Sequence, residues 1–289
     1  MNPIKNLLNV ENIFINFDEF KLNNISFVLK KGHIMGLIGP NGAGKTTTIK
    51  LILNILKKQN GKIQILNKDI FENELEIKEN IGVVFDSNYF IEDWTIKEVE
   101  IAVKMFYKNW DTYKFKLFLK KFNIYEGKKV RELSKGMKMK LMIACALSHD
   151  PKLLILDEPT SGLDAISRNE LLNILTDYIK DGEHSVLFST HIMDDLDKIA
   201  DDITYINNGE IIYTGNKKNL LNSFRIVRGK INELNSDLEK KLIGVRKSFK
   251  EFEGLIRVEN INKFPNLIYE LASMDDIIIF TNIGGKNNV

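Results

Sequence analysis

The sequence predicts an α/β fold with a parallel sheet at its centre, an antiparallel β subdomain, an α-helical subdomain and a small α+β extension at the C-terminal end. The parallel sheet is predicted from three apolar segments with the pattern of buried strands, at residues 33–38, 153–157 and 186–191. The first segment leads into a glycine-rich loop, the second ends at two carboxylates, and the third ends at a histidine. Open parallel sheets bind ligands at the carboxyl ends of their strands, so we expect a ligand at that end.

The antiparallel subdomain is predicted from strand-like alternation of apolar and polar residues. Residues 7–29 alternate in this way, and residues 61–66 and 209–213 are expected as short edge hairpins of the same layer. Together with the parallel sheet, these segments place the first domain at residues 1–220.

The helical subdomain is expected at about residues 90–147, since the apolar period becomes helical from residue 94 onward. Thr95 followed by Glu98 predicts a capping box at the start of this region. The region is rich in aromatic rings at helical spacing, and most of them are expected in the core: Phe106, Tyr107, Trp110, Tyr113, Phe115, Phe118 and Phe122.

Residues 221–289 are predicted as a separate C-terminal α+β extension. The apolar pattern gives the order βαββαβ, which suggests a ferredoxin-like arrangement. Dimer bracing, regulation and simple stabilisation all remain open as its role. The expected elements are a strand at 224–230, a helix at 233–241, a hairpin of 244–249 with 255–259, a helix at 264–272 and a strand at 276–281.

Composition limits the class of protein. With 44% apolar residues and a net charge of +2, the chain can bury a full core and offers no electrostatic argument for a nucleic-acid partner. Its single cysteine, Cys145, excludes a disulfide within one chain and a cysteine-based zinc framework. The sequence has no signal-peptide pattern and no run of eighteen apolar residues, so we expect a soluble, cytosolic protein.

The segment GPNGAGKTT at residues 39–47 matches the phosphate-binding pattern G-x-x-x-x-G-K-[ST] in full. Glycines let backbone N–H groups turn toward phosphate oxygens, and the helix expected at residues 47–56 adds the positive end of its dipole. Lys45 is expected to reach the β- and γ-phosphates, and the Thr46 hydroxyl is expected to contact Mg²⁺. The sequence therefore predicts a P-loop NTPase core, with a nucleotide contacted by Asn41, Gly42, Ala43, Gly44, Lys45, Thr46 and Thr47.

Two adjacent carboxylates, Asp157 and Glu158, follow the apolar segment at 153–156 in the sequence LLILDEPTSGLD. Acids at the end of a buried strand are costly unless a cation or a proton accompanies them. We therefore expect Asp157 to hold the Mg²⁺ shell and Glu158 to polarise the attacking water. A purely structural role is the alternative for this pair.

Two further motifs complete the pattern. Ser134, in the sequence LSKGM, stands where the N-cap of an apolar-periodic helix at 137–147 is expected, and helix starts attract anions. The strand at 186–191 ends in His191. A plain helix cap and an ordinary polar histidine are the alternatives that use no phosphate.

The four motifs in this order resemble the ATP-binding subunit of ABC transporters, over about the first three quarters of the chain. The resemblance implies an ATPase with ATP and Mg²⁺ as cofactors, in which two subunits meet head to tail. Ser134, Lys135 and Gly136 would then belong to the ATP site of the partner subunit, and Asp164 to the conserved SGLD loop. His191 would sense the γ-phosphate.

The chain departs from the family pattern at two places. Lys135 and Met137 replace a glycine and the glutamine of the usual LSGGQ signature, while Ser134 and Gly136 are kept. Asp86 ends the segment IGVVFD where the family generally has a glutamine that contacts the metal. Its carboxylate still offers oxygen to Mg²⁺ but is shorter and charged.

The aromatic residues near these motifs have two expected roles. By resemblance Phe17, rather than Phe20, is expected to stack on the nucleotide base, with a place in the sheet core as the alternative. Tyr89, Phe90 and Trp94 follow Asp86, where the family presents a groove to its membrane partner.

The resemblance is greatest to exporters of antibiotics, bacteriocins and toxic amphipathic peptides, including phenol-soluble modulins. It implies a separate integral-membrane subunit, either a homodimer or pairing with a second ATPase subunit, and a peripheral position on the inner face of the cell membrane. The alternative is a soluble ABC protein that acts in translation or on chromosomes without a membrane subunit. Such proteins usually carry two ATPase units in one chain or a long coiled-coil insertion, and this sequence has neither.

Overall fold

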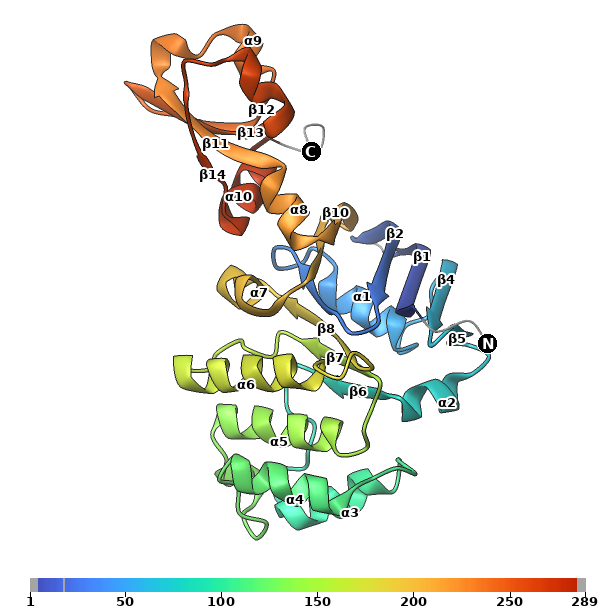
Figure 1. The fold of residues 1–289 in the computed structure, drawn as a ribbon. Coiled ribbons are helices and arrows are strands. Elements are labelled where there is room, and N and C mark those ends of the chain that lie inside the picture. The colour runs from blue at the N-terminus through green and yellow to red at the C-terminus, as the bar shows by residue number, and fades with distance from the viewer. Residues whose placement is uncertain (1–4, 18, 285–289) are drawn as a thin grey trace. The chain divides into compact units, whose positions relative to one another are not determined.

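The computed structural model describes residues 5–17 and 19–284 and forms two compact units, Met1–Thr214 and Gly215–Val289 (Figure 1). The division falls earlier than the boundary expected at residue 220. The short helix α8 (Lys217–Asn222) therefore belongs to the second unit.

The first unit is built on a six-stranded sheet with the order β10-β9-β3-β8-β7-β6 (Figure 1). Strands β6, β7, β8, β3 and β9 are parallel, and every side chain of β3, β7 and β8 is buried. Continuous apolar strands of this kind are typical of a parallel sheet covered on both faces. The bounds are β3 (Ile34–Ile38), β6 (Ile81–Val84), β7 (Leu153–Asp157), β8 (Ser185–Thr190), β9 (Asp202–Asn207) and β10 (Glu210–Asn216).

The placement of residues 209–213 in the antiparallel layer was wrong, because residues 210–213 lie in β10 at the edge of the central sheet and Gly209 lies in the turn before it. Asn208 and Gly209 both have positive φ, 47° and 73°. An Asn-Gly pair in this conformation forms a tight hairpin turn, so the chain returns directly beside β9.

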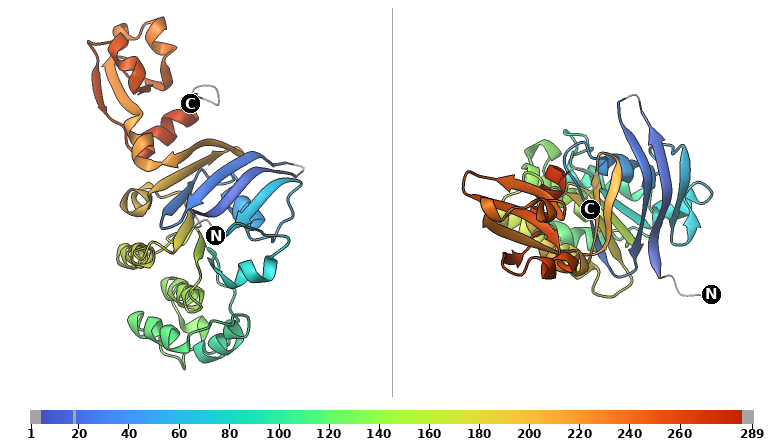
Figure 2. Two further views of the ribbon diagram at one scale, coloured as in Figure 1. Left: turned by 45° about the vertical axis from the view of Figure 1, so that its right-hand side comes forward. Right: turned by 90° about the horizontal axis from the view of Figure 1, so that it is seen from above.

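The antiparallel sheet has the order β2-β1-β4-β5. One core cluster joins its apolar face to α1 and to the central sheet, through residues such as Leu8, Ile49 and Leu187. Figure 2 shows these blue strands on a different side of the central sheet from the green helices. The bounds are β1 (Asn6–Asn16), β2 (Lys21–Lys30), β4 (Asn60–Ile65), β5 (Lys68–Asp69) and α1 (Lys45–Ile52).

The helical subdomain has the predicted capping box. Thr95 Oγ1 accepts from the Glu98 amide at 3.3 Å, and Glu98 Oε2 accepts from the Thr95 amide at 2.7 Å. Phe115 and Phe122 are buried as expected, but Phe106 and Tyr113 are 79% and 72% exposed. Phe106 lies in the turn after the first helix of the subdomain, and Tyr113 lies on the outer face of a short helix that buries only one side. The remaining helices of the unit are α2 (Glu74–Glu79), α3 (Ile96–Lys104), α4 (Thr112–Lys121), η1 (Val130–Glu132), α5 (Lys135–Leu147), α6 (Ala165–Tyr178) and α7 (Met193–Ile199).

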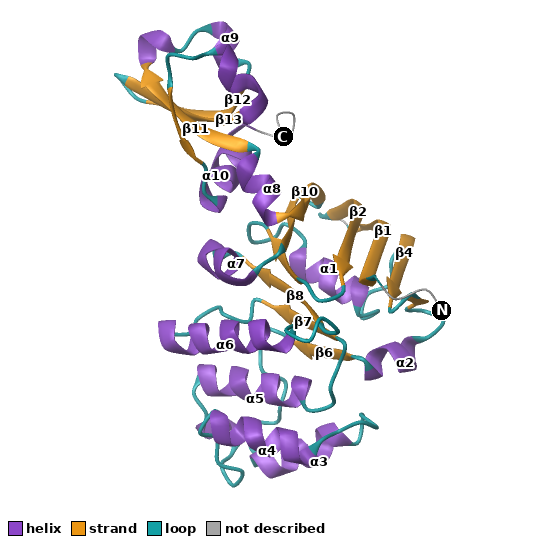
Figure 3. Ribbon diagram, viewed as in Figure 1, coloured by secondary structure: helices purple, strands orange, loops and turns teal. Residues whose placement is uncertain are grey.

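The second unit is an antiparallel sheet with the order β12-β13-β11-β14, accompanied by helices (Figure 3). Since β11 and β12 both run antiparallel to the intervening β13, they are parallel to each other and form a split βαβ unit. Helix α10 packs against β12 and β13. The bounds are β11 (Phe224–Lys230), η2 (Ile231–Glu233), α9 (Ser236–Glu239), β12 (Leu242–Lys247), β13 (Glu251–Arg257), η3 (Val258–Lys263), β14 (Ile268–Leu271) and α10 (Met274–Gly284).

The last two elements of the extension were predicted wrongly, with helix and strand exchanged. Residues 264–272 contain strand β14, which pairs with β11, and residues 276–281 lie in helix α10. Ser273 and Asp276 explain the helix start: the Asp276 carboxylate accepts from the Ser273 amide at 2.9 Å, and Ser273 Oγ accepts from the Asp276 amide at 3.1 Å. A capping pair of this type fixes the first turn of a helix.

Candidate nucleotide site

The loop between β3 and α1 forms the floor of a cavity of about 490 Å³. Gly39 is required there, because a Cβ on it would lie 2.1 Å from the Ile206 carbonyl oxygen. Gly44 has φ of 113°, and a Cβ on it would lie 2.4 Å from the Leu22 side chain. The cavity is lined by Phe20, Asn41, Gly42, Ala43, Gly44, Lys45, Thr46, Thr47, Asp86 and Glu158.

Helix α1 begins at Lys45 and ends at Ile52, earlier than the predicted end at residue 56. Leu53 is its C-cap, and Asn54 then takes a left-handed φ of 55° that stops the helix. The amino end of α1 opens on the cavity, where its amide groups and dipole favour an anion.

Lys45 is held at the cavity by three contacts although only 6% of it is exposed. Its ammonium donates to the carbonyl oxygens of Gly39 and Pro40 at 2.8 and 3.3 Å, and it lies 3.2 Å from Glu158 Oε1. The cation is therefore fixed beside the loop, with a carboxylate as its counter-ion.

Glu158 and His191 lie together at the ends of β7 and β8. Glu158 Oε2 lies 2.8 Å from His191 Nδ1, and the Glu158 amide donates to Ser189 Oγ at 2.9 Å. Glu158 has a left-handed φ of 51°, which is uncommon for a residue with a side chain and is often found at functional sites. Lys45, Glu158 and His191 thus form a continuous chain of polar contacts along the edge of the sheet.

Asp157 is 3% exposed, and its Oδ1 accepts from Ser189 Oγ at 2.5 Å. Asp86 is exposed on the cavity wall. Partial burial, reinforced by the negative charges of Asp86 and Asp157, raises the pKa of Tyr89. These two carboxylates and the Thr46 hydroxyl are the hard oxygen donors that Mg²⁺ prefers, so the residues present fit this ion.

The sequence reasoning missed Ser189 and preferred Phe17 to Phe20. Ser189 orients both Asp157 and the Glu158 backbone, and a serine close to the end of an otherwise apolar strand was the available signal. Phe20 lines the cavity, whereas Phe17 is 42% exposed and is not among the lining residues. The stacking role of Phe17 therefore stays a prediction.

The signature segment lies at the start of α5. Ser134 is its N-cap, as predicted, and accepts from the Met137 amide at 3.2 Å. The Lys135 side chain lies over Gly162, whose Cβ, if present, would be 2.7 Å from Lys135 Nζ. Asp164 caps α6 by accepting from the amides of Ile166 and Ser167 at 3.0 and 2.9 Å.

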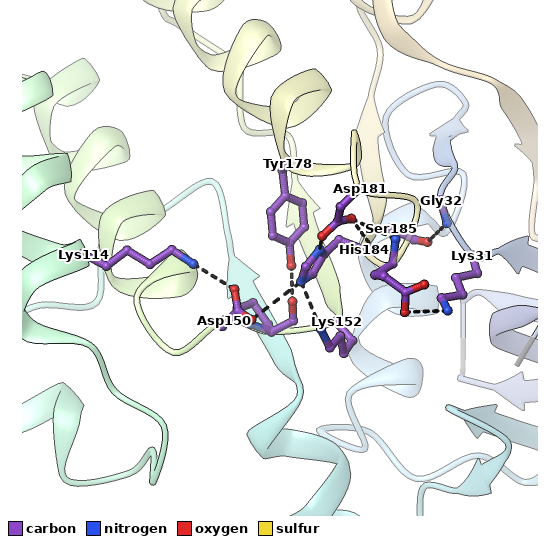
Figure 4. A network of polar contacts seen from close by, with 11 residues as sticks. Lys31, Gly32, Lys114, Asp150, Lys152, Tyr178, Asp181, His184 and Ser185 are labelled. Carbon is purple, nitrogen blue, oxygen red and sulfur yellow. Dashed lines mark hydrogen bonds and ion pairs between the residues drawn. The ribbon is translucent and has the colours of Figure 1, made fainter.

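A second polar cluster lies before the amino ends of β3, β7 and β8, at the edge opposite the cavity (Figure 4). His184 Nδ1 is 2.6 Å from Asp181 Oδ2, and Lys152 Nζ is 3.3 Å from His184 Nε2. The Lys114 ammonium donates to Asp150 at 2.9 Å, which ties α4 to this edge. The cluster joins elements far apart in the sequence and contains none of the predicted site residues.

The chain is similar in sequence to proteins of one known family. A sequence profile described as ABC transporter matches residues 22–161. The ABC transporter ATP-binding protein NatA of Bacillus subtilis (strain 168) is 34% identical over 210 residues, which cover 71% of this chain and 85% of that protein. The chain belongs to the ABC transporter ATP-binding protein family. It is an ABC-type ATPase.

Other relatives of this ABC ATP-binding subunit are named for transport. The bacitracin transport ATP-binding protein BcrA of Bacillus licheniformis is 34% identical, with 66% of this chain and 63% of that protein covered. The Nod factor export ATP-binding protein I of Burkholderia orbicola (strain AU 1054) is 33% identical, with 71% and 69% covered. A solved ATP-binding subunit of an ABC transporter has 27% identity and a TM-score of 0.68, over 74% of this chain and 91% of that chain.

Proposed function

We propose that this ABC ATP-binding subunit drives the export of a peptide, antibiotic or other amphipathic substrate through a separate membrane subunit. The observation that supports ATP-driven work most directly is that Lys45 and Glu158 line the phosphate-loop cavity in contact with each other, while His191 contacts Glu158. The relatives named for bacitracin transport and Nod factor export support the cargo class and the direction.

In the proposed reaction Lys45 holds the β- and γ-phosphates, and the loop amides orient them for attack. Glu158 accepts hydrogen bonding from the attacking water, and His191 contacts the γ-phosphate while keeping the Glu158 carboxylate in place. Thr46, Asp157 and Asp86 are the residues that would hold Mg²⁺. When bound, the ion supplies neutralising charge to the phosphate oxygens.

The partner subunit is proposed to complete each site. Ser134, Lys135 and Gly136 are not among the residues that line the cavity of their own chain. They stand at the amino end of α5, where a capping hydroxyl and free amides favour an anion. A head-to-tail dimer of two copies, or a pairing with a second ATPase subunit, would bring this helix start to the nucleotide of the other subunit.

Docking to the membrane subunit is proposed on the helical subdomain. None of the helices in the described residues has the combination of length and apolar composition that crossing a bilayer requires. The helical subdomain instead exposes large apolar side chains, which are typical of interaction surfaces. Tyr89, Phe90 and Trp94 are proposed to contact this partner, and Tyr89 is 56% exposed. The other exposed apolar side chains of this region include Ile91, Ile101, Met105, Phe106, Leu117 and Tyr125. Such docking would place the protein on the inner face of the cell membrane.

The test is purification of the tagged full chain from membranes in mild detergent, with identification of the proteins that accompany it. The expected result is that an integral-membrane protein accompanies the chain in a fixed stoichiometry. Tyr89→Ala should weaken this association, whereas Leu75→Ala is the control for non-specific hydrophobic binding. Leu75 is also exposed, at 84%, but lies outside the helical subdomain. Recovery without any membrane protein would favour the alternative, a soluble ABC protein that acts without a membrane subunit. ATP-dependent uptake of cargo into inside-out vesicles would establish export, and uptake only into right-side-out vesicles would refute it.

A further inference from the structure

Arg168 and Asp195 form a charged pair that the proposed ATP chemistry does not use. Arg168 lies in the first turns of α6 and Asp195 in the first turn of α7, and Arg168 Nε is 4.0 Å from Asp195 Oδ1. The Asp195 side chain is completely buried, whereas 28% of the Arg168 side chain is exposed. A buried carboxylate of this kind requires an explanation.

The pair is close but not hydrogen-bonded. Among the described residues, neither carboxylate oxygen of Asp195 has a hydrogen-bond partner, and neither does Arg168 Nε. A charge-assisted bond between such groups is about 2.7–2.9 Å long, so the two atoms stand about 1 Å beyond bonding distance. Because an unsatisfied buried charge is costly, a small approach of the two helices would be favourable.

Each member of the pair stands one helical turn from a loop of the proposed site. The Arg168 amide donates to the carbonyl oxygen of Asp164, the cap residue of the SGLD loop, at 2.9 Å. Asp195 follows His191, which contacts Glu158 at 2.8 Å. A bond between the two side chains would therefore connect the loop that ends at Asp164 with the loop that carries His191.

Helix α7 is anchored on both sides of Asp195. Leu196 is fully buried against β3 at Gly36, where a Cβ would lie 2.1 Å from Leu196 Cδ2. On the solvent side, Lys198 Nζ donates to Asn169 Oδ1 of α6 at 3.0 Å. Asp195 thus lies on a helix that is held at both sides of it.

We propose that Arg168 and Asp195 are positioning residues whose hydrogen bond forms in the nucleotide-bound dimer and holds His191 and Glu158 in the reactive arrangement. This inference rests on the roles proposed for Glu158 and His191. It predicts that the pair contributes to turnover and contributes little to the stability of the nucleotide-free fold.

The test compares Asp195→Asn with Asp194→Asn in the full-length protein. Both changes remove one negative charge from the first turn of α7, but Asp194 is exposed. For Asp195→Asn we expect an unchanged or higher melting temperature without nucleotide, a kcat about tenfold lower and a KM for ATP within about twofold of wild type. Asp194→Asn should match wild type in all three quantities.

Arg168 provides a second pair of variants in case Asp195→Asn does not fold. Arg168→Lys keeps a charged donor and should retain more kcat than Arg168→Gln, and the double variant Asp195→Asn with Arg168→Gln should lose no more kcat than either single change. Equal kcat in Arg168→Lys and Arg168→Gln would overturn the proposal. So would wild-type kcat in Asp195→Asn, or a nucleotide-free melting temperature several degrees lower.

Glu158→Gln measured in parallel separates the two proposals. If Glu158→Gln keeps wild-type turnover, the role proposed for Glu158 is wrong and this inference falls with it. If Glu158→Gln abolishes turnover while Asp195→Asn does not change it, only the link between the helices is wrong.

Discussion

Replacing Glu158 by glutamine tests the proposed chemistry with the smallest change in shape. The Glu158 carboxylate contacts Lys45 Nζ at 3.2 Å and His191 Nδ1 at 2.8 Å, and a glutamine can occupy the same space without the charge. Lys45 keeps its bonds to the carbonyl oxygens of Gly39 and Pro40, so the cation should remain at the cavity. The variant is therefore expected to fold and to bind ATP.

Turnover should fall by about 10²–10⁴-fold, because a positioned general base is usually worth that much. This corresponds to about 3–5 kcal/mol in the activation barrier. ATP affinity should stay the same or rise by up to about tenfold, since Lys45 no longer has a carboxylate competing with the phosphates. The opposite effects on turnover and affinity distinguish a lost base from a damaged site.

The assay pairs phosphate release under saturating ATP and magnesium with equilibrium binding of a fluorescent ATP analogue. Glu170→Gln is the matched control, because Glu170 is an exposed glutamate of α6 that pairs with Lys140 and lies outside the cavity. It should retain both properties. Near-normal hydrolysis in Glu158→Gln would remove Glu158 from the role of base.

The other predictions concern the metal contact, a helix cap and the buried thiol. Asp86→Gln should bind ATP nearly as well as wild type and should keep or raise transport-coupled hydrolysis in the presence of the membrane subunit, whereas a large loss of magnesium-dependent activity would show that the Asp86 carboxylate is a required ligand. Thr95→Ala should lower the free energy of unfolding by about 1 kcal/mol in urea titrations, because it removes the cap of α3. Thr95→Ser keeps a capping hydroxyl and should lower it by less. Equal stability of the two variants would contradict the contribution of the cap. Burial leaves 6% of Cys145 exposed and raises the pKa of its thiol, so Ellman's reagent at pH 8 should react with it only after unfolding, and rapid reaction of the native protein would contradict this placement.

The parts of the site that follow from local sequence could be predicted. The phosphate loop, the acids after β7 and the cap at Ser134 each depend on a few neighbouring residues, and the structure places Lys45, Glu158 and His191 in contact. The approach of Arg168 to Asp195 could not be predicted, because it depends on how α6 and α7 pack.

The errors occurred where short apolar segments fit both a strand and a helix. The segment at 276–281 is almost continuously apolar, and only the Ser273–Asp276 pair marks it as the start of a helix. Residues 268–271 became strand β14 through pairing with β11, where Arg228 contacts Glu270 at 2.9 Å across the strands. A pattern of neighbouring residues cannot predict contacts between residues so far apart in the sequence.

The central claim is that two copies of the chain enclose two nucleotides, with Ser134 and Gly136 of each copy completing the site of the other. The most direct measurement is the mass of Glu158→Gln by light scattering at high concentration, with and without ATP and magnesium. The account predicts a dimer only when ATP is bound, and its loss when Ser134→Arg is added. A protein that stays monomeric with saturating ATP and magnesium, even together with its membrane subunit, would contradict the account.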